Sequence, residues 1–203
     1  MATLSDALRV YKYTRSKGLL DGLNRVLKIY LANKSTFGSA VIDAIVMGAH
    51  QRWLRNNPKI DFPAFKSDVE AALSKLLPLE RPETFEELYQ AVKDKIGHIA
   101  GVGDLTLYDI ALRIGFLYER PLLPRARVYI QSGALDGIKA LSADPRYSYL
   151  FSIHAGAWKN GAYSIEVFED AFGSMESMFI EDFLCVFHKE FSSLGTYTIK
   201  QLQ

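Results

Sequence analysis

The stretch of residues 96–110 reads IGHIAGVGDLTLYDI, and it decides how the rest of the chain is interpreted. Its centre is a pair of glycines, Gly101 and Gly103, separated by the hydrophobic residue Val102. On both sides, hydrophobic residues recur at the three- and four-residue spacing of an amphipathic helix. The pattern therefore predicts two helices joined by a tight glycine turn, over about residues 85–117.

The same spacing predicts helices along most of the remaining chain. Gly18 follows the first periodic run and is predicted to end that helix. Asp61 is predicted to cap a later helix with Pro63 in its first turn, and the segment 84–87 (TFEE) has the pattern of a capping box. The expected helices cover about residues 4–17, 19–33, 39–57, 61–77, 85–96, 105–117, 132–141, 165–172 and 180–191.

The run Val128-Tyr129-Ile130 has β-forming residues, but it is too short to imply a sheet. We therefore expect an all-α protein, a compact multi-helix domain of about eight or nine helices over residues 1–203. Prolines between residues 78 and 83 mark the one plausible seam, which would give lobes 1–79 and 80–203.

Composition excludes several classes of protein. With 203 residues, 49% of them hydrophobic and 12% aromatic, the chain can bury enough surface to fold. No window approaches 18 consecutive apolar residues, and the N-terminal residues lack a basic segment followed by an apolar run, so neither a membrane span nor a secretory signal is expected. The single cysteine, Cys185, excludes an internal disulfide and fits a reducing, cytoplasmic location.

The glycine turn resembles the helix-hairpin-helix element of DNA repair and recombination proteins. The match lies at Ile99, Gly101, Val102, Gly103, Thr106 and Ile110. The sequence departs from the family pattern at Ala100, where proline is common, at Leu105, where lysine often stands, and at Leu107, where a small residue is preferred.

The resemblance implies that backbone N–H groups at the helix start bind a DNA phosphate without reading the bases. The implied phosphate-binding residues are Gly101, Val102, Gly103 and Thr106, and His98 beside the turn could donate to the same phosphate. The alternative is a purely structural corner between two helices. Asp104 would then cap the second helix, rather than place a carboxylate near the phosphate.

A second resemblance covers roughly the C-terminal half. Residues 103–115, the segment 128–130 and the segment 181–185 (EDFLC) resemble recurrent blocks in uncharacterised bacterial proteins, which carry a GxGxLTxYDxAxRIG string. This resemblance implies no activity.

A catalytic function finds little support. DNA glycosylases with lyase activity carry a lysine where this chain has Leu105, and the segment 127–131 lacks the carboxylate expected at their catalytic position. A divergent glycosylase-like enzyme is therefore only a further alternative. His50, His98, His154 and His188 lack metal-ligand spacing, and no phosphate-loop or dinucleotide fingerprint occurs. We expect no catalytic residue, no metal and no cofactor.

The near-neutral total charge hides a regional polarity. Residues 1–59 carry ten basic and three acidic residues, whereas residues 160–203 carry two basic and seven acidic ones. A basic face formed by Arg9, Lys12, Arg15 and Lys28 could follow a phosphate backbone. The alternatives are a solvated helix face, or a contact between the basic and acidic ends within one chain or between protomers.

The sequence thus predicts a non-catalytic, sequence-independent DNA-binding protein. The alternative is a helical protein-interaction module, with a protein partner or a second copy of the chain as its ligand.

Overall fold

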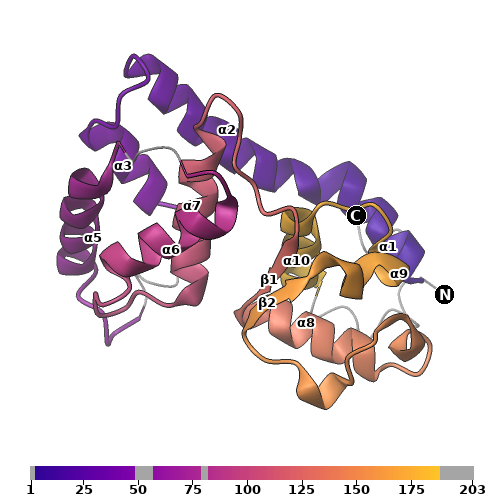
Figure 1. Ribbon diagram of the computed structural model, residues 1–203. Coiled ribbons are helices and arrows are strands. Elements are labelled where there is room, and N and C mark those ends of the chain that lie inside the picture. Colours follow the sequence, from indigo (N-terminus) through magenta and orange to yellow (C-terminus); the bar gives the residue numbers. More distant parts are fainter. Residues whose placement is uncertain (1–2, 49–56, 79–81, 188–203) are drawn as a thin grey trace. The chain divides into compact units, whose positions relative to one another are not determined.

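The computed structural model describes residues 3–48, 57–78 and 82–187, and it is mainly helical, with one two-stranded sheet (Figure 1). The chain divides into two compact units. Unit 1 combines Met1–Leu20 with Pro124–Gln203, and unit 2 is the continuous segment Asp21–Leu123. Each unit is described by itself below.

The boundaries of the units differ from those of the predicted lobes 1–79 and 80–203. The seam at residues 78–83 lies inside unit 2, between α5 (Phe62–Leu76) and α6 (Phe85–Ile96). These two helices pack against each other. The proline-containing connection therefore joins two helices of one unit.

The first helical segment is longer than predicted. α1 (Leu4–Val10) continues through a π-helical turn (Tyr11–Arg15) directly into α2 (Ser16–Ala32). The prediction that Gly18 ends the first helix is wrong, because Gly18 lies exposed inside α2 and nothing stands within 4 Å of where its Cβ would be. An exposed glycine weakens a helix by about 1 kcal/mol, which is too little to break one continued on both sides.

α1 begins with a reciprocal cap that the sequence interpretation missed. The Thr3 hydroxyl accepts a hydrogen bond from the Asp6 N–H (3.2 Å), and the Asp6 carboxylate accepts one from the Thr3 N–H (3.0 Å). Each side chain thus satisfies a donor at the helix start that has no partner within the helix.

The expectation of an all-α fold needs one correction, in unit 1. β1 (Arg127–Ile130) pairs antiparallel with β2 (Gly161–Ser164), with Val128 opposite Tyr163 (Figure 1). The run 128–130 alone is too short to predict a sheet, and the strand that pairs with it lies more than 30 residues farther along the chain. Pairing over that distance has no local signal in the sequence.

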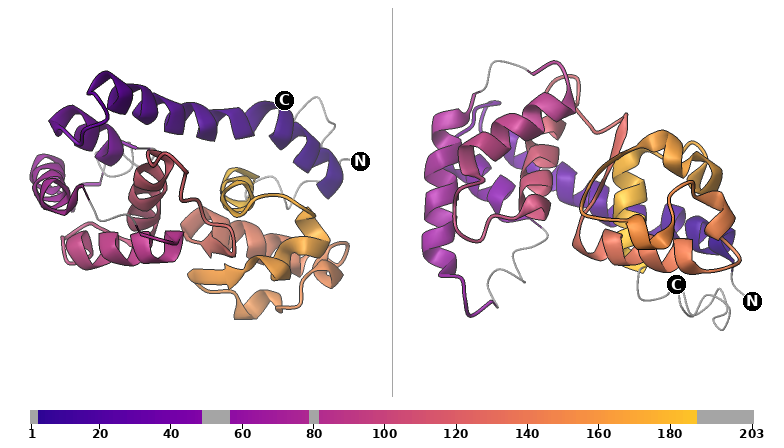
Figure 2. Two further views of the ribbon diagram at one scale, coloured as in Figure 1. Left: turned by 45° about the horizontal axis from the view of Figure 1, so that its top comes forward. Right: turned by 60° about the horizontal axis from the view of Figure 1, so that its bottom comes forward.

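Two long helices of unit 1 pack against each other beside this sheet. α8 (Ser132–Ala143) lies against α10 (Ser177–Phe187), and α10 also contacts β1 (Figure 2). Gly137 permits the contact between α8 and α10, because a Cβ there would overlap the carbonyl oxygen of Leu184. The unit is completed by α9 (Glu169–Phe172) and by 3-10 turns at Ser148–Leu150, Ala155–Ala157 and Ile165–Phe168.

An aromatic cluster fills the core of unit 1. Trp158 is only 1% exposed, and its ring centroid lies 4.8 Å from that of Tyr163 and 5.7 Å from that of Phe168. The buried face of α1 joins the same core through Leu4, Ala7 and Val10.

Unit 2 contains α3 (Ser39–Val46), α5, α6 and α7 (Asp104–Phe116), together with the larger part of α2. α3 was predicted to reach residue 57 but ends at Val46, and the segment 49–56 lies outside the described residues. The predicted helix over 180–191 is α10, and its last predicted residues likewise fall outside the described part.

The two predicted caps in unit 2 are present. Asp61 accepts from the Ala64 N–H (3.2 Å) ahead of Pro63, as expected. Thr84 accepts from the Glu87 N–H (3.2 Å), but the Glu87 carboxylate accepts from the N–H of Glu83 (2.8 Å) instead of that of Thr84. The return bond of the expected capping box is thus displaced by one residue.

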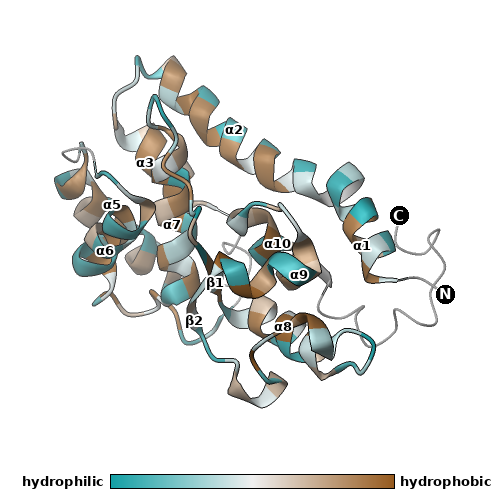
Figure 3. Cartoon of the chain, turned by 45° about the vertical axis from the view of Figure 1, so that its right-hand side comes forward, coloured by the Kyte–Doolittle hydropathy of each residue, from teal (hydrophilic) through white to brown (hydrophobic). Residues whose placement is uncertain are grey.

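The helices differ in how much of their surface is apolar (Figure 3). Hydrophobic and hydrophilic residues alternate along α2, whose Leu23 and Val26 are buried, whereas α7 is buried almost throughout Leu107–Gly115. Within the described residues, no helix combines the length and the apolar character that crossing a membrane requires.

Candidate functional site

The turn between α6 and α7 is held by its own backbone. Gly97 caps the end of α6, and its N–H donates to the carbonyl of Lys93 (2.8 Å). The N–H groups of Ile99 and Val102 donate to the carbonyls of Ile96 and Ile99, both at 3.0 Å. These bonds fix the path of the chain from one helix to the next.

Gly101 is required by the fold. Its φ is +93°, a conformation that residues with a side chain rarely adopt. A Cβ there would also lie 3.2 Å from the ring of Phe65 and 3.3 Å from the side chain of Ile60. Gly101 therefore allows the turn to pack on α5 and its preceding residues, a structural role that the sequence pattern did not separate from phosphate binding.

Gly103 stands in a different environment. It is the N-cap of α7, with φ −112° and ψ 173°, an extended conformation open to any residue. Nothing lies within 4 Å of where a Cβ would be, and no side-chain cap bond is formed. The first N–H groups of a helix have no carbonyl partner inside it. At the start of α7, these donors therefore lie beside open space at Gly103.

Asp104 does not cap α7, contrary to the structural alternative considered from the sequence. It is the first residue of the helix and is exposed, and Gly103 holds the N-cap position. Burial, and then the charge of Asp104, raise the pKa of Tyr89 on α6. A negative charge thus lies near the start of α7, where it interacts favourably with the helix dipole.

The turn brings together the five residues predicted to bind phosphate. His98, Gly101 and Gly103 are exposed, whereas Val102 and Thr106 are half-buried, with Thr106 in the first turn of α7.

The predicted basic face is divided between the units. Arg9 is exposed and forms an ion pair with Asp6 (3.2 Å), and Lys12 is exposed in the π-helical turn, both in unit 1. Arg15 ends that turn, and its side chain lies outside the described part. Lys28 is exposed on α2 and is the one member that belongs to unit 2 with the glycine turn.

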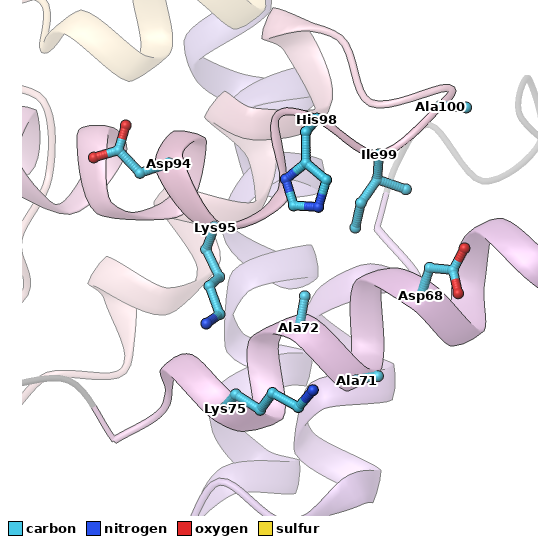
Figure 4. A pocket seen from close by; sticks show the side chains of 9 residues that line it. All are labelled: Asp68, Ala71, Ala72, Lys75, Asp94, Lys95, His98, Ile99 and Ala100. Carbon is cyan, nitrogen blue, oxygen red and sulfur yellow. The ribbon is translucent and has the colours of Figure 1, made fainter.

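An open groove of about 670 Å³ lies beside the turn, between α5 and the end of α6 (Figure 4). α5 lines it with Asp68, Ala71, Ala72 and Lys75. The facing wall comes from Asp94 and Lys95 of α6 and from residues 98–100 of the turn. The sequence interpretation missed this groove, because its two walls are some 20 residues apart and meet only when the helices pack.

The charges of the groove are separated along its length. Lys75 and Lys95 lie on the side of the groove away from Asp68, and the Lys75 side chain runs back toward the middle of the groove, below Ala72 (Figure 4). The Asp94 carboxylate points away from the lysines and accepts a hydrogen bond from Gln90 on its own helix (2.6 Å). Ala72 and Ile99 form an apolar stretch between the two ends.

The polar residues of the second resemblance have structural contacts. Arg113 is buried in α7, where its guanidinium donates to the Asp109 carbonyl (3.0 Å) and lies 3.8 Å from the Asp109 carboxylate. In α10, the Asp182 carboxylate accepts from the Tyr11 hydroxyl (2.7 Å). The pKa of Tyr11 is raised, first by burial of the hydroxyl and then by the charge of Asp182.

Within the described ranges, no three His, Cys, Asp or Glu side chains lie together as a metal site would require. Unit 2 as a whole is balanced in charge, with 13 basic and 13 acidic residues in its sequence. A comparison with protein-family models, with curated proteins and with solved structures finds no match.

Proposed function

We propose that this protein binds the DNA backbone without catalysis and without reading the bases, through the start of α7. The observation that carries the proposal is the open N-cap at Gly103, where no side chain covers the donors of the helix. A phosphate placed there would accept hydrogen bonds from these N–H groups and would lie at the positive end of the helix dipole.

The surroundings favour weak binding. His98 lies on the same turn and can add to the interaction, and Lys28 is the member of the predicted basic face that belongs to the same unit. The carboxylate of Asp104 repels a phosphate, and the balanced charge of unit 2 supplies no long-range attraction. We therefore expect a binding site that holds a few phosphates.

The test is a Gly103→Asp variant, because aspartate is a good N-cap residue. Its carboxylate would take up the free N–H groups and repel a phosphate, while the stability of α7 stays the same or rises by a few tenths of a kcal/mol. Fluorescence anisotropy with a labelled duplex at about 50 mM salt should show affinity reduced at least tenfold.

Gly38→Asp is the matched control. Gly38 is the glycine N-cap of α3 in the same unit, also without a side-chain cap, so the substitution adds the same charge at an equivalent position. Its affinity for DNA should equal that of the unmodified protein. Equal weakening in both variants would overturn the proposal, and so would a complete lack of DNA binding.

A second candidate function is protein interaction, which the balanced charge of unit 2 and the 59% exposed side chain of Leu31 favour. An exposed leucine on a helix can anchor a partner through apolar contact. This candidate predicts a complex or oligomer, observed by light scattering after size-exclusion chromatography, that resists salt and is lost in Leu31→Glu.

A further inference from the structure

The groove between α5 and the α6 end has the chemistry of a ligand site. Its volume of about 670 Å³ falls in the range of about 300–1,000 Å³ that small-molecule sites occupy. Three separate parts of unit 2 contribute to it: α5, α6 and the turn. It shares His98 with the residues predicted to bind phosphate at the glycine turn, but Gly103 itself does not line it.

One end of the groove suits a phosphate group. Lys75 comes from α5 and Lys95 from α6, and both lie on the side of the groove away from Asp68 (Figure 4). An ammonium group is a compact charge with three donors, and two such groups from different helices can neutralise one phosphate. Asp94, the acidic residue nearest in sequence, is turned away and held by Gln90.

The rest of the groove suits the remainder of a nucleotide. Ala72 and Ile99 offer an apolar surface against which a flat base can lie. Asp68 stands beyond them, and a carboxylate accepts hydrogen bonds from ribose hydroxyls or from the amino groups of a base. From the two lysines to Asp68, the groove is therefore lined first by cationic, then mainly by apolar and then by acidic side chains, with the imidazole of His98 between Lys95 and Ile99.

We propose that this groove binds a nucleoside phosphate, with the phosphate between Lys75 and Lys95 and the nucleoside directed toward Asp68. The ligand is either a free nucleotide or an unpaired nucleotide of a strand, since both present an anionic phosphate joined to a nucleoside. The inference goes beyond backbone binding at Gly103, and the two sites can be tested separately.

The first experiment is titration calorimetry with adenosine 5′-monophosphate, adenosine and inorganic phosphate. The monophosphate should bind at least tenfold more tightly than adenosine, because hydrogen bonds to a charged group contribute more than neutral ones. Lys75→Gln and Lys95→Gln should each weaken its binding about tenfold. Lys93→Gln is the matched control, since Lys93 is an exposed lysine of α6 outside the groove, and it should change nothing.

Asp68→Ala tests the other end of the groove. The variant should bind adenosine 5′-monophosphate more weakly and inorganic phosphate at least as tightly as before, because only the nucleoside reaches Asp68. All these side chains are exposed or half-buried, and circular dichroism will show that the variants remain folded.

Competition identifies the source of the nucleotide. If a (dA)10 strand displaces the monophosphate, the site takes an unpaired nucleotide of a strand; if it does not, the site takes a free nucleotide. Either result supports the inference when binding depends on Lys75 and Lys95.

The inference is overturned if millimolar monophosphate does not bind, or if Lys93→Gln weakens binding as much as Lys95→Gln. Gly103→Asp should leave monophosphate binding intact, so the failure of one proposal is distinguishable from the failure of the other.

Discussion

Gly101 and Gly103 look equivalent in the sequence, but their surroundings in the structure are opposite. Gly101 has a positive φ and packs against Phe65, whereas Gly103 is extended and has open space around it. The first glycine therefore serves the fold, and the second leaves room for a ligand. A pattern of residue types contains neither the dihedral angle nor the neighbours, so it could not separate the two roles.

Substitution of the two glycines should separate them in stability measurements. Gly101→Ala should lower the free energy of unfolding by about 1–3 kcal/mol, because alanine is strained at positive φ and its Cβ crowds Phe65. Gly103→Ser should raise it by a few tenths of a kcal/mol, because serine is a better N-cap than glycine. Chemical denaturation of both variants checks this. Equal losses would contradict the distinction.

The buried Tyr11 hydroxyl predicts a pH dependence. Burial and Asp182 raise the pKa of Tyr11 in the folded protein above that of the unfolded chain, so the folded state keeps this proton after the unfolded state has lost it. Stability therefore falls as pH rises above about 10, by about 1.4 kcal/mol per pH unit for this group.

Tyr11→Phe removes this titration. The variant should be less stable by about 1–2 kcal/mol at pH 7, through loss of the hydrogen bond to Asp182. Its stability should decline less steeply than that of the unmodified protein between about pH 10 and pH 11. Denaturant unfolding at several pH values measures both. Parallel curves above pH 10 would contradict the assigned role of Tyr11.

At the scale of elements, the contact between α8 and α10 depends on a single glycine. Gly137→Ala would place a Cβ onto the Leu184 carbonyl, and the helices would have to separate. We expect a loss of about 1–3 kcal/mol, as for other overpacked contacts.

Gly22→Ala is the control for helix propensity. Gly22 is an exposed glycine inside α2 with nothing within 4 Å of its Cβ position, so alanine should stabilise the protein by about 0.5–1 kcal/mol. Thermal and chemical denaturation will show whether the two substitutions change the free energy of unfolding in opposite directions. A stabilising Gly137→Ala would mean that the two helices do not pack this closely.

Local signals predicted most of the helices and failed where distant residues decide. The sequence predicts the caps Asp61 and Thr84 correctly, because a cap is made by residues within one turn. The prediction that Gly18 ends the first helix is wrong, because an exposed glycine does not itself show whether the helix continues beyond it. The strand at 128–130 and the groove between α5 and α6 both require partners far along the chain.

At the scale of the whole molecule, charge limits how DNA can bind. The first 59 residues are mainly basic and the last 44 mainly acidic, but unit 2 has no net charge, because it contains 13 basic and 13 acidic residues. The candidate contact at Gly103 can therefore neutralise few phosphates.

The salt dependence of binding tests this limit. With one to three phosphates neutralised, the logarithm of the DNA-binding constant should fall with the logarithm of salt concentration with a slope of about −1 to −3. Anisotropy titrations between about 25 and 200 mM salt measure the slope. A slope of about −6 or steeper would place the main DNA contact on another, more basic surface.

Unit 1 is made from both ends of the sequence, whereas unit 2 is one continuous segment, and this affects the order of events on the ribosome. The buried residues Leu4, Ala7 and Val10 pack with residues that follow Val128 and extend to Leu184. A nascent chain has therefore made all of unit 2 before α1 can find its partners. Unit 2 can begin to fold during translation, while the first helix has to wait until its partners between residues 128 and 184 have been synthesised.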